Sequence, residues 1–88
     1  PNLWWNHLGP LNISQSECVS KGKTLLSENK AGKIQASEDS LHAKSDTSIS
    51  VIECLSFGTG ITVMVVVASN DVAKGDKLFN QLKKGMEK

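Results

Sequence analysis

The chain has 88 residues, with ten Lys and Arg side chains against nine Asp and Glu, and a formal net charge of +1. This length allows one small domain with a thin hydrophobic core, over residues 1–88. Because the charge is nearly balanced, the sequence lacks the broad positive field that binding to a nucleic-acid backbone requires. Nucleic acid is therefore disfavoured as a partner.

Residues 1–13 carry a local apolar cluster that includes both tryptophans, Trp4 and Trp5. Gly9 and Pro10 interrupt this cluster, so any helix before them is short. Adjacent indoles cannot both face one side of a short segment, and two arrangements remain open. Either one indole fills the small core while the other covers its rim, or an exposed indole contacts a partner. Because tryptophan is enriched at binding hot spots, Trp4 and Trp5 are candidate contact residues.

Residues 14–48 are polar and serine-rich, and they carry the weakest pattern in the chain. Two semi-apolar pieces, KTLLSEN at 23–29 and GKIQASED at 32–39, predict a hairpin, although the composition fits a mobile arm equally well. Gly22-Lys23-Thr24 matches the tail of a phosphate-binding loop. That loop begins with a glycine five residues earlier, where this chain has Glu17, so we expect no nucleotide site.

The segment SLHAKSDT, residues 40–47, resembles the active-site stretch of the HPr phosphocarrier family, in which an LHARP-type sequence opens a helix. The resemblance implies that His42 accepts a phosphoryl group. It also implies that Lys44 stands where an arginine steadies the phosphate. Ser45 replaces the proline that begins the family's helix. A phosphocarrier using His42 is the third-ranked hypothesis for this chain.

Residues 49–68, ISVIECLSFGTGITVMVVVA, form the most apolar stretch of the sequence. Apolar residues recur at every second position on both sides of Gly58-Thr59-Gly60, which predicts two β-strands joined by a tight turn. Glu53 breaks the apolar row of the first strand. The second strand is apolar on both faces, so we expect it to be central in a sheet and covered on each side.

The same stretch is also long enough for a single transmembrane helix over 49–68 with polar flanks. Lysines follow it, as the positive-inside rule requires, and Asn12-Ile13-Ser14 is a glycosylation-type sequon on the opposite side. Glu53 opposes this alternative, because a carboxylate near the centre of a span costs up to about 3 kcal/mol. The hairpin is favoured, and with it a soluble domain over a membrane-embedded one.

A C-terminal helix is predicted over about residues 71–87. The segment SND supplies candidate N-caps, and apolar residues then recur at helical spacing at Leu78, Phe79, Leu82 and Met86. Lys77 and Lys84 of this helix join the candidate contact residues. The hairpin-then-helix ending resembles those of roadblock, profilin and pleckstrin-homology domains.

No side-chain pattern in the sequence is typical of catalysis. His7, His42, Cys18 and Cys54 are scattered without a metal-ligand spacing, so we expect neither a metal nor a cofactor. There is no G-x-S-x-G elbow, and we expect no enzymatic activity. Cys54 is predicted to be a small buried hydrophobe, whereas Cys18 is either exposed or paired with Cys54.

The sequence therefore predicts an α+β domain with a small antiparallel sheet. Its central apolar hairpin, 49–68, is packed by the C-terminal helix and extended by weaker strands from residues 23–48. The predicted function is a non-catalytic interaction module that binds a protein, a peptide or a second copy of itself. The contact surface is a sheet face or edge together with the Trp4 and Trp5 segment. The second hypothesis is a small single-pass subunit of a membrane complex.

Overall fold

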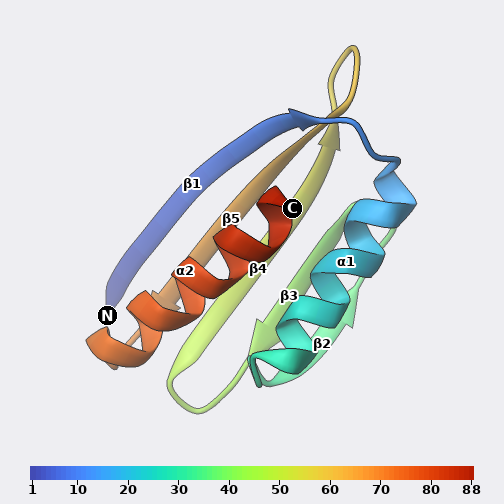
Figure 1. Cartoon of the computed structure of the whole chain (residues 1–88). Coiled ribbons are helices and arrows are strands. Elements are labelled where there is room, and N and C mark those ends of the chain that lie inside the picture. Colours follow the sequence, from blue (N-terminus) through green and yellow to red (C-terminus); the bar gives the residue numbers. More distant parts are fainter.

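The computed structural model describes all 88 residues and contains a five-stranded antiparallel sheet and two helices. In chain order the elements are β1 (Asn2–Leu11), α1 (Gln15–Glu28), β2 (Lys33–Ala36), β3 (Ser40–Lys44), β4 (Ser48–Ser56), β5 (Ile61–Ser69) and α2 (Val72–Glu87). The strand order across the sheet is β1-β5-β4-β3-β2. Both helices lie on one side of the sheet (Figure 1), which we call the inner face. The opposite side is the outer face.

The predicted hairpin of residues 49–68 is confirmed as β4 and β5, which pair antiparallel along their whole length. Gly58 and Gly60 in the turn have φ angles of 64° and 81°, a region that favours glycine. Residues 49–68 therefore do not form the alternative single helix. No helix in this fold combines the length and the apolar character needed to cross a bilayer.

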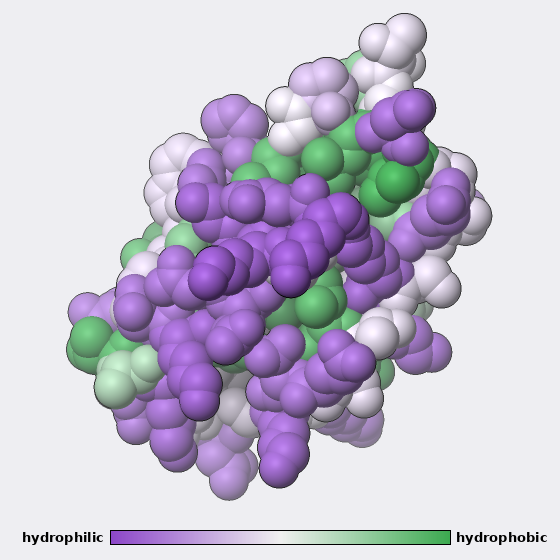
Figure 2. Space-filling view, viewed as in Figure 1, coloured by the Kyte–Doolittle hydropathy of each residue, from purple (hydrophilic) through white to green (hydrophobic).

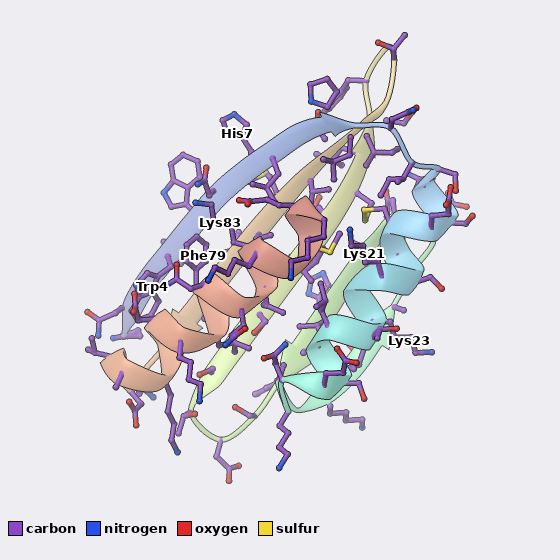
Figure 3. All side chains as sticks on the ribbon, in the orientation of Figure 1. Trp4, His7, Lys21, Lys23, Phe79 and Lys83 are labelled. Carbon is purple, nitrogen blue, oxygen red and sulfur yellow. A yellow bond between two sulfur atoms is a disulfide. The ribbon has the colours of Figure 1, made fainter.

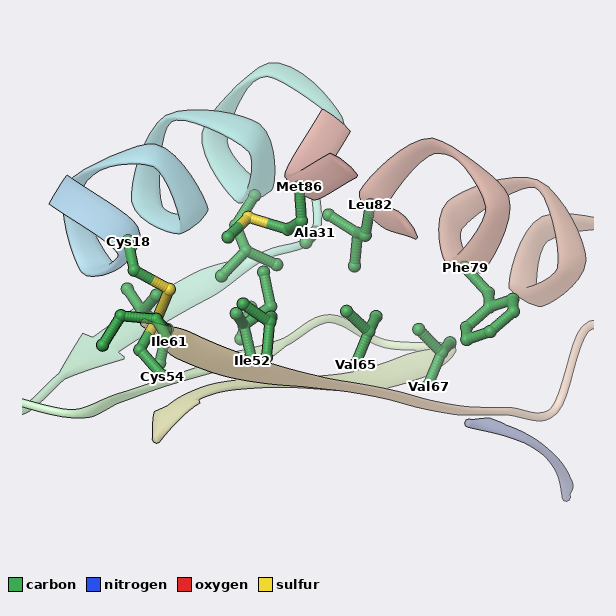
Figure 4. Close-up of a cluster of buried hydrophobic side chains, with 14 residues drawn as sticks. Cys18, Ala31, Ile52, Cys54, Ile61, Val65, Val67, Phe79, Leu82 and Met86 are labelled. Carbon is green, nitrogen blue, oxygen red and sulfur yellow. A yellow bond between two sulfur atoms is a disulfide. The ribbon is translucent and has the colours of Figure 1, made fainter. Parts of the chain in front are cut away.

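The hydrophobic core lies between the inner face and the two helices (Figure 4). Successive strand side chains point to opposite sides, so every second residue of β5 enters this core. Val63, Val65 and Val67 are fully buried there. The predicted C-terminal helix is confirmed as α2, whose N-cap Asp71 accepts a hydrogen bond from the backbone N–H of Lys74 at 3.0 Å. Its buried side is formed by Gly75, Phe79, Leu82 and Met86.

The central position predicted for the second strand is confirmed, because β5 lies between β1 and β4. The expectation that both of its faces are covered is wrong. The outward residues of β5 are only partly buried, and no helix lies over them. These residues are Thr62, Met64, Val66 and Ala68. One apolar side of the strand therefore faces away from the core.

The short helix considered for the N-terminal segment is wrong, because residues 2–11 form the edge strand β1. Its register with β5 runs from Asn2 opposite Ser69 to Leu8 opposite Val63. Pairing with β1 satisfies backbone groups of β5 that would otherwise be left without a partner. Strand β1 also alternates in burial, and Trp4 packs on the inner side while Trp5 is exposed.

The hairpin predicted between residues 23–29 and 32–39 is also wrong, because residues 23–28 belong to α1. A capping box begins this helix. The Oγ of Ser14 accepts a hydrogen bond from the backbone N–H of Glu17 at 3.1 Å, and the Glu17 carboxylate accepts one from the N–H of Ser14 at 3.0 Å. Hydrogen bonds from Ser14 to the Glu17 carboxylate, chiefly the one from the Ser14 backbone N–H, hold the pKa of Glu17 below its ordinary value.

Strands β2 and β3 form the hairpin of this region, with Lys33 opposite Lys44. The weaker strands expected within residues 23–48 therefore exist, but they are confined to residues 33–44. Both strands extend the sheet beyond β4.

A disulfide joins Cys18 of α1 to Cys54 of β4, across 36 residues of sequence. Both cysteines are fully buried within the core (Figure 4). The sequence left two possibilities open for Cys18, and the structure shows the bridge. The bond fixes the start of α1 to the inner face of the sheet.

Candidate functional site

The outer face of the sheet is a grid whose rows run across the strands. The register between neighbouring strands defines three rows. In strand order β1, β5, β4, β3, β2, the first row is Leu3, Ala68, Ile49, Lys44 and Lys33. The second is Trp5, Val66, Val51, His42 and Gln35. The third is His7, Met64, Glu53 and Ser40.

The part of this grid on β1, β5 and β4 is mainly apolar. We call the following residues the apolar patch: Leu3, Trp5, Ile49, Val51, Leu55, Met64, Val66 and Ala68, where Leu55 lies beyond the third row, opposite Thr62. Three of its large side chains are well exposed, with relative accessibilities of 64% for Leu3, 62% for Trp5 and 47% for Ile49. Contiguous exposed apolar surface of this kind typically marks an interaction site. The rest of the grid, on β3 and β2, is polar and carries Lys33 and Lys44.

Two polar side chains lie in the third row beside the apolar patch. His7 of β1 and Glu53 of β4 flank Met64, one on each side of β5. Strands two places apart in a sheet are separated by about 9–10 Å, and no hydrogen bond or ion pair joins His7 to Glu53 across β5 in the structure. Each therefore presents its polar end to whatever covers the outer face.

The structure separates the two predicted tryptophans. Trp4 is partly buried on the inner side, where its ring packs against Gly75 of α2, and Figure 3 shows it beside that helix. Trp5 lies in the apolar patch on the opposite side of the sheet. The sequence left open whether either indole is exposed. The exposed one is Trp5, whereas Trp4 belongs to the packing between β1 and α2.

The structure does not bring Lys77 and Lys84 together with Trp5. Both are exposed on α2, on the helix side of the molecule, where hydrophilic residues dominate the surface (Figure 2). Lys77 lines a polar cleft of about 390 Å³ between the two helices, together with Lys30 and Lys74. The four candidate contact residues thus divide between two opposite faces.

His42 lies in the middle of β3, opposite Gln35 on one side and Val51 on the other. The helix that the HPr resemblance implies after this histidine is absent, because residues 40–44 are extended. His42 borders a shallow depression of about 240 Å³ on the outer face, which Lys33 and Lys44 also line. No three His, Cys, Asp or Glu side chains converge anywhere in the structure as a metal site would require.

Leu3, His7 and Glu53 were not among the sequence-predicted site residues. The sequence did contain a signal for Glu53. It follows Ile49 and Val51, and precedes Leu55, at every second position along one strand, so these four side chains face the same side of the sheet. The position of His7 depends on β1 being a strand, which local composition did not indicate. Figure 3 shows His7 projecting from β1 away from α2.

Comparison with known proteins gives no match: no family model matches the sequence, and no curated protein or solved structure matches the chain. The function of this chain therefore has to be inferred from its own side chains.

The two neighbouring tryptophans should respond differently to truncation. Trp4→Ala removes a ring packed against α2, and we expect it to lower the free energy of unfolding by about 2–3 kcal/mol, less than for a fully buried indole. Trp5→Ala removes an exposed ring, and we expect a change within about 0.5 kcal/mol. Urea denaturation of dilute protein measures both. An equal loss for the two variants would contradict the assignment of Trp5 to a free surface.

Proposed function

We propose that this protein is a non-catalytic interaction module that binds a protein partner through the apolar patch of its outer face. The observation that carries this proposal is the exposure of Leu3, Trp5 and Ile49 on a sheet face that no helix covers. Burial of each such side chain would contribute about 1.5–3 kcal/mol, and a side chain left in water does not make this contribution. A partner that covers the patch recovers this free energy.

The distribution of polarity on the outer face also supports binding to a protein. Protein interfaces typically have an apolar centre with aromatic residues and a polar, solvated rim. Here Trp5 and Val66 lie in the apolar part, while Lys33 and Lys44 lie at its margin on β2 and β3. An exposed tryptophan in such a setting is a typical hot spot.

We favour the outer face of the sheet over the free edge of β1 as the contact surface. An edge strand can pair with an extended peptide through its outward N–H and C=O groups. In β1, however, the backbone N–H of His7 already donates to the Oδ1 of Asn6 at 2.8 Å. One of the donors needed for edge pairing is therefore already used within the chain.

The buried disulfide supports a second proposal, about the compartment in which the chain works. Disulfides persist in oxidising surroundings such as the secretory lumen, the periplasm or the extracellular space, and they are rare where thiols are kept reduced. A bridge such as Cys18–Cys54 contributes about 2–4 kcal/mol. That is a large share of the stability of a small domain, so we propose that the protein functions in an oxidising compartment.

Thiol alkylation of the protein from its own cells tests this compartment. Denaturation in iodoacetamide without reductant should leave both Cys18 and Cys54 unmodified, because the bridge protects them. The same treatment after reduction should modify both and serves as the control. Mass spectrometry that finds both cysteines alkylated without reductant would contradict the proposal.

Site-specific photo-crosslinking tests the proposed contact face. Trp5 is replaced by p-benzoylphenylalanine in the full chain, and Phe57, which is 69% exposed in the β4–β5 turn outside the patch, is replaced in a matched control. We expect position 5 to form a discrete crosslink to a protein, and we expect position 57 not to form it. No product, or the same products from position 57, would overturn the proposal.

A further inference from the structure

We propose that the partner of the apolar patch is a second copy of this chain. In this arrangement two chains pack outer face against outer face about a two-fold axis that runs along β5. The inference rests on the proposed function and specifies its partner. It follows from the way in which the polar and apolar side chains are placed on either side of β5.

The third row of the grid supplies the electrostatic argument. His7 and Glu53 stand at equal distances from β5, on β1 and β4 respectively. A two-fold axis along β5 places β1 of each chain over β4 of the other. His7 then faces the partner's Glu53, and Glu53 faces the partner's His7. An imidazole N–H can donate to a carboxylate, so the only two ionisable groups among the apolar side chains satisfy each other twice.

The first and second rows are complementary under the same axis. Trp5 faces the partner's Val51, so a large ring lies over a small side chain, and Leu3 faces the partner's Ile49. Val66 of β5 meets the partner's Val66. Stacked sheets lie about 10 Å apart, and their strands cross at up to about 30°. Because this angle moves facing side chains apart with distance from the axis, the pairs closest to the axis are the best aligned.

The lysines on β2 and β3 disfavour an axis closer to β3. With the axis on β5, β3 and β2 of each chain extend past the partner's β1, and Lys33 and Lys44 remain in water. An axis moved towards β3 would place Lys44 under the apolar side chains of the partner. Burying an unpaired ammonium costs several kcal/mol, so that arrangement is disfavoured.

The size of the contact sets the expected strength. Three strands spaced by about 4.8 Å and about eight residues long give a footprint of roughly 14 by 26 Å per chain. That footprint, about 360 Å² per chain, is less than half of the roughly 800 Å² per partner of a standard interface. We therefore expect a weak, reversible dimer with a dissociation constant on the order of 100 micromolar.

Charge reversal tests the arrangement. Glu53→Lys removes the acceptor of the partner's His7, and His7→Glu places a carboxylate against the partner's Glu53. We expect each single change to weaken dimerisation at least about tenfold, or about 1.4 kcal/mol, in sedimentation equilibrium. The double variant His7→Glu with Glu53→Lys restores an opposite-charge pair across the axis, and we expect its affinity to return to within about threefold of the wild type.

Glu38→Lys provides the matched control, because Glu38 is exposed in the β2–β3 turn and lies outside the face. This variant should dimerise like the wild type, and circular dichroism should show all variants folded. A wild-type chain that stays monomeric up to about 1 mM, the limit of a weak protein complex, would overturn the inference. A double variant that is no stronger than the singles would also overturn it.

The crosslink from position 5 separates this inference from the proposed function. A product that contains two copies of the chain supports both proposals. A product with a different protein, combined with a monomeric wild-type chain, overturns the second-copy inference and leaves the interaction module standing. Crosslinking to no protein at all contradicts both.

Discussion

The pairing of β4 with β5 is the constraint on which the rest of this structure depends. Its inner side carries the valines of β5, on which α2 packs, and the buried residues of β4, on which α1 packs; among these is Cys54, to which α1 is bonded. Strand β1 is aligned by β5, and β3 is aligned by β4. The same pairing also fixes what lies outside, because side chains alternate across a strand.

The alternation leaves an outer face with an unusual composition. An antiparallel sheet with one solvated face typically places polar residues there. In this chain β3 and β2 follow that rule, whereas β1, β5 and β4 present apolar side chains on both sides. An apolar surface exposed to water is unfavourable in a lone monomer and carries a risk of aggregation. The contrast between the two halves of one face is the main reason for assigning a binding role to the apolar half.

The elements whose apolar residues recur at a regular spacing were predicted correctly from the sequence. The elements without such a spacing were not predicted. The alternation in 49–68 and the helical spacing of 78–86 were sufficient to predict β4, β5 and α2. Helix α1 was missed because two of its three buried positions are Cys18 and Gly22, which do not register as an apolar stripe. Strand β1 was missed because its partner β5 lies more than fifty residues away in the sequence, and local patterns carry no signal of such pairing.

The candidate site was predicted only in part, for a related reason. The two adjacent indoles left open whether either one is exposed, and in the structure Trp5 is exposed. The grouping of Trp5 with Ile49 and Glu53 required the register between three strands, which composition does not contain. Lys77 and Lys84 lie on the predicted C-terminal helix, but helical spacing does not say which side of the sheet the helix covers, and α2 places them on the side opposite Trp5.

The most direct test of the account is the solvent exposure of methyl groups across the sheet. Relaxation of methyl protons by a soluble gadolinium complex distinguishes outer from inner side chains in one NMR sample. We expect Ile49, Val51 and Val66 to relax strongly in dilute protein and to become protected as the concentration rises, while Val65 stays protected throughout. Outer methyl groups as protected as Val65 at every concentration would contradict the existence of an open apolar face.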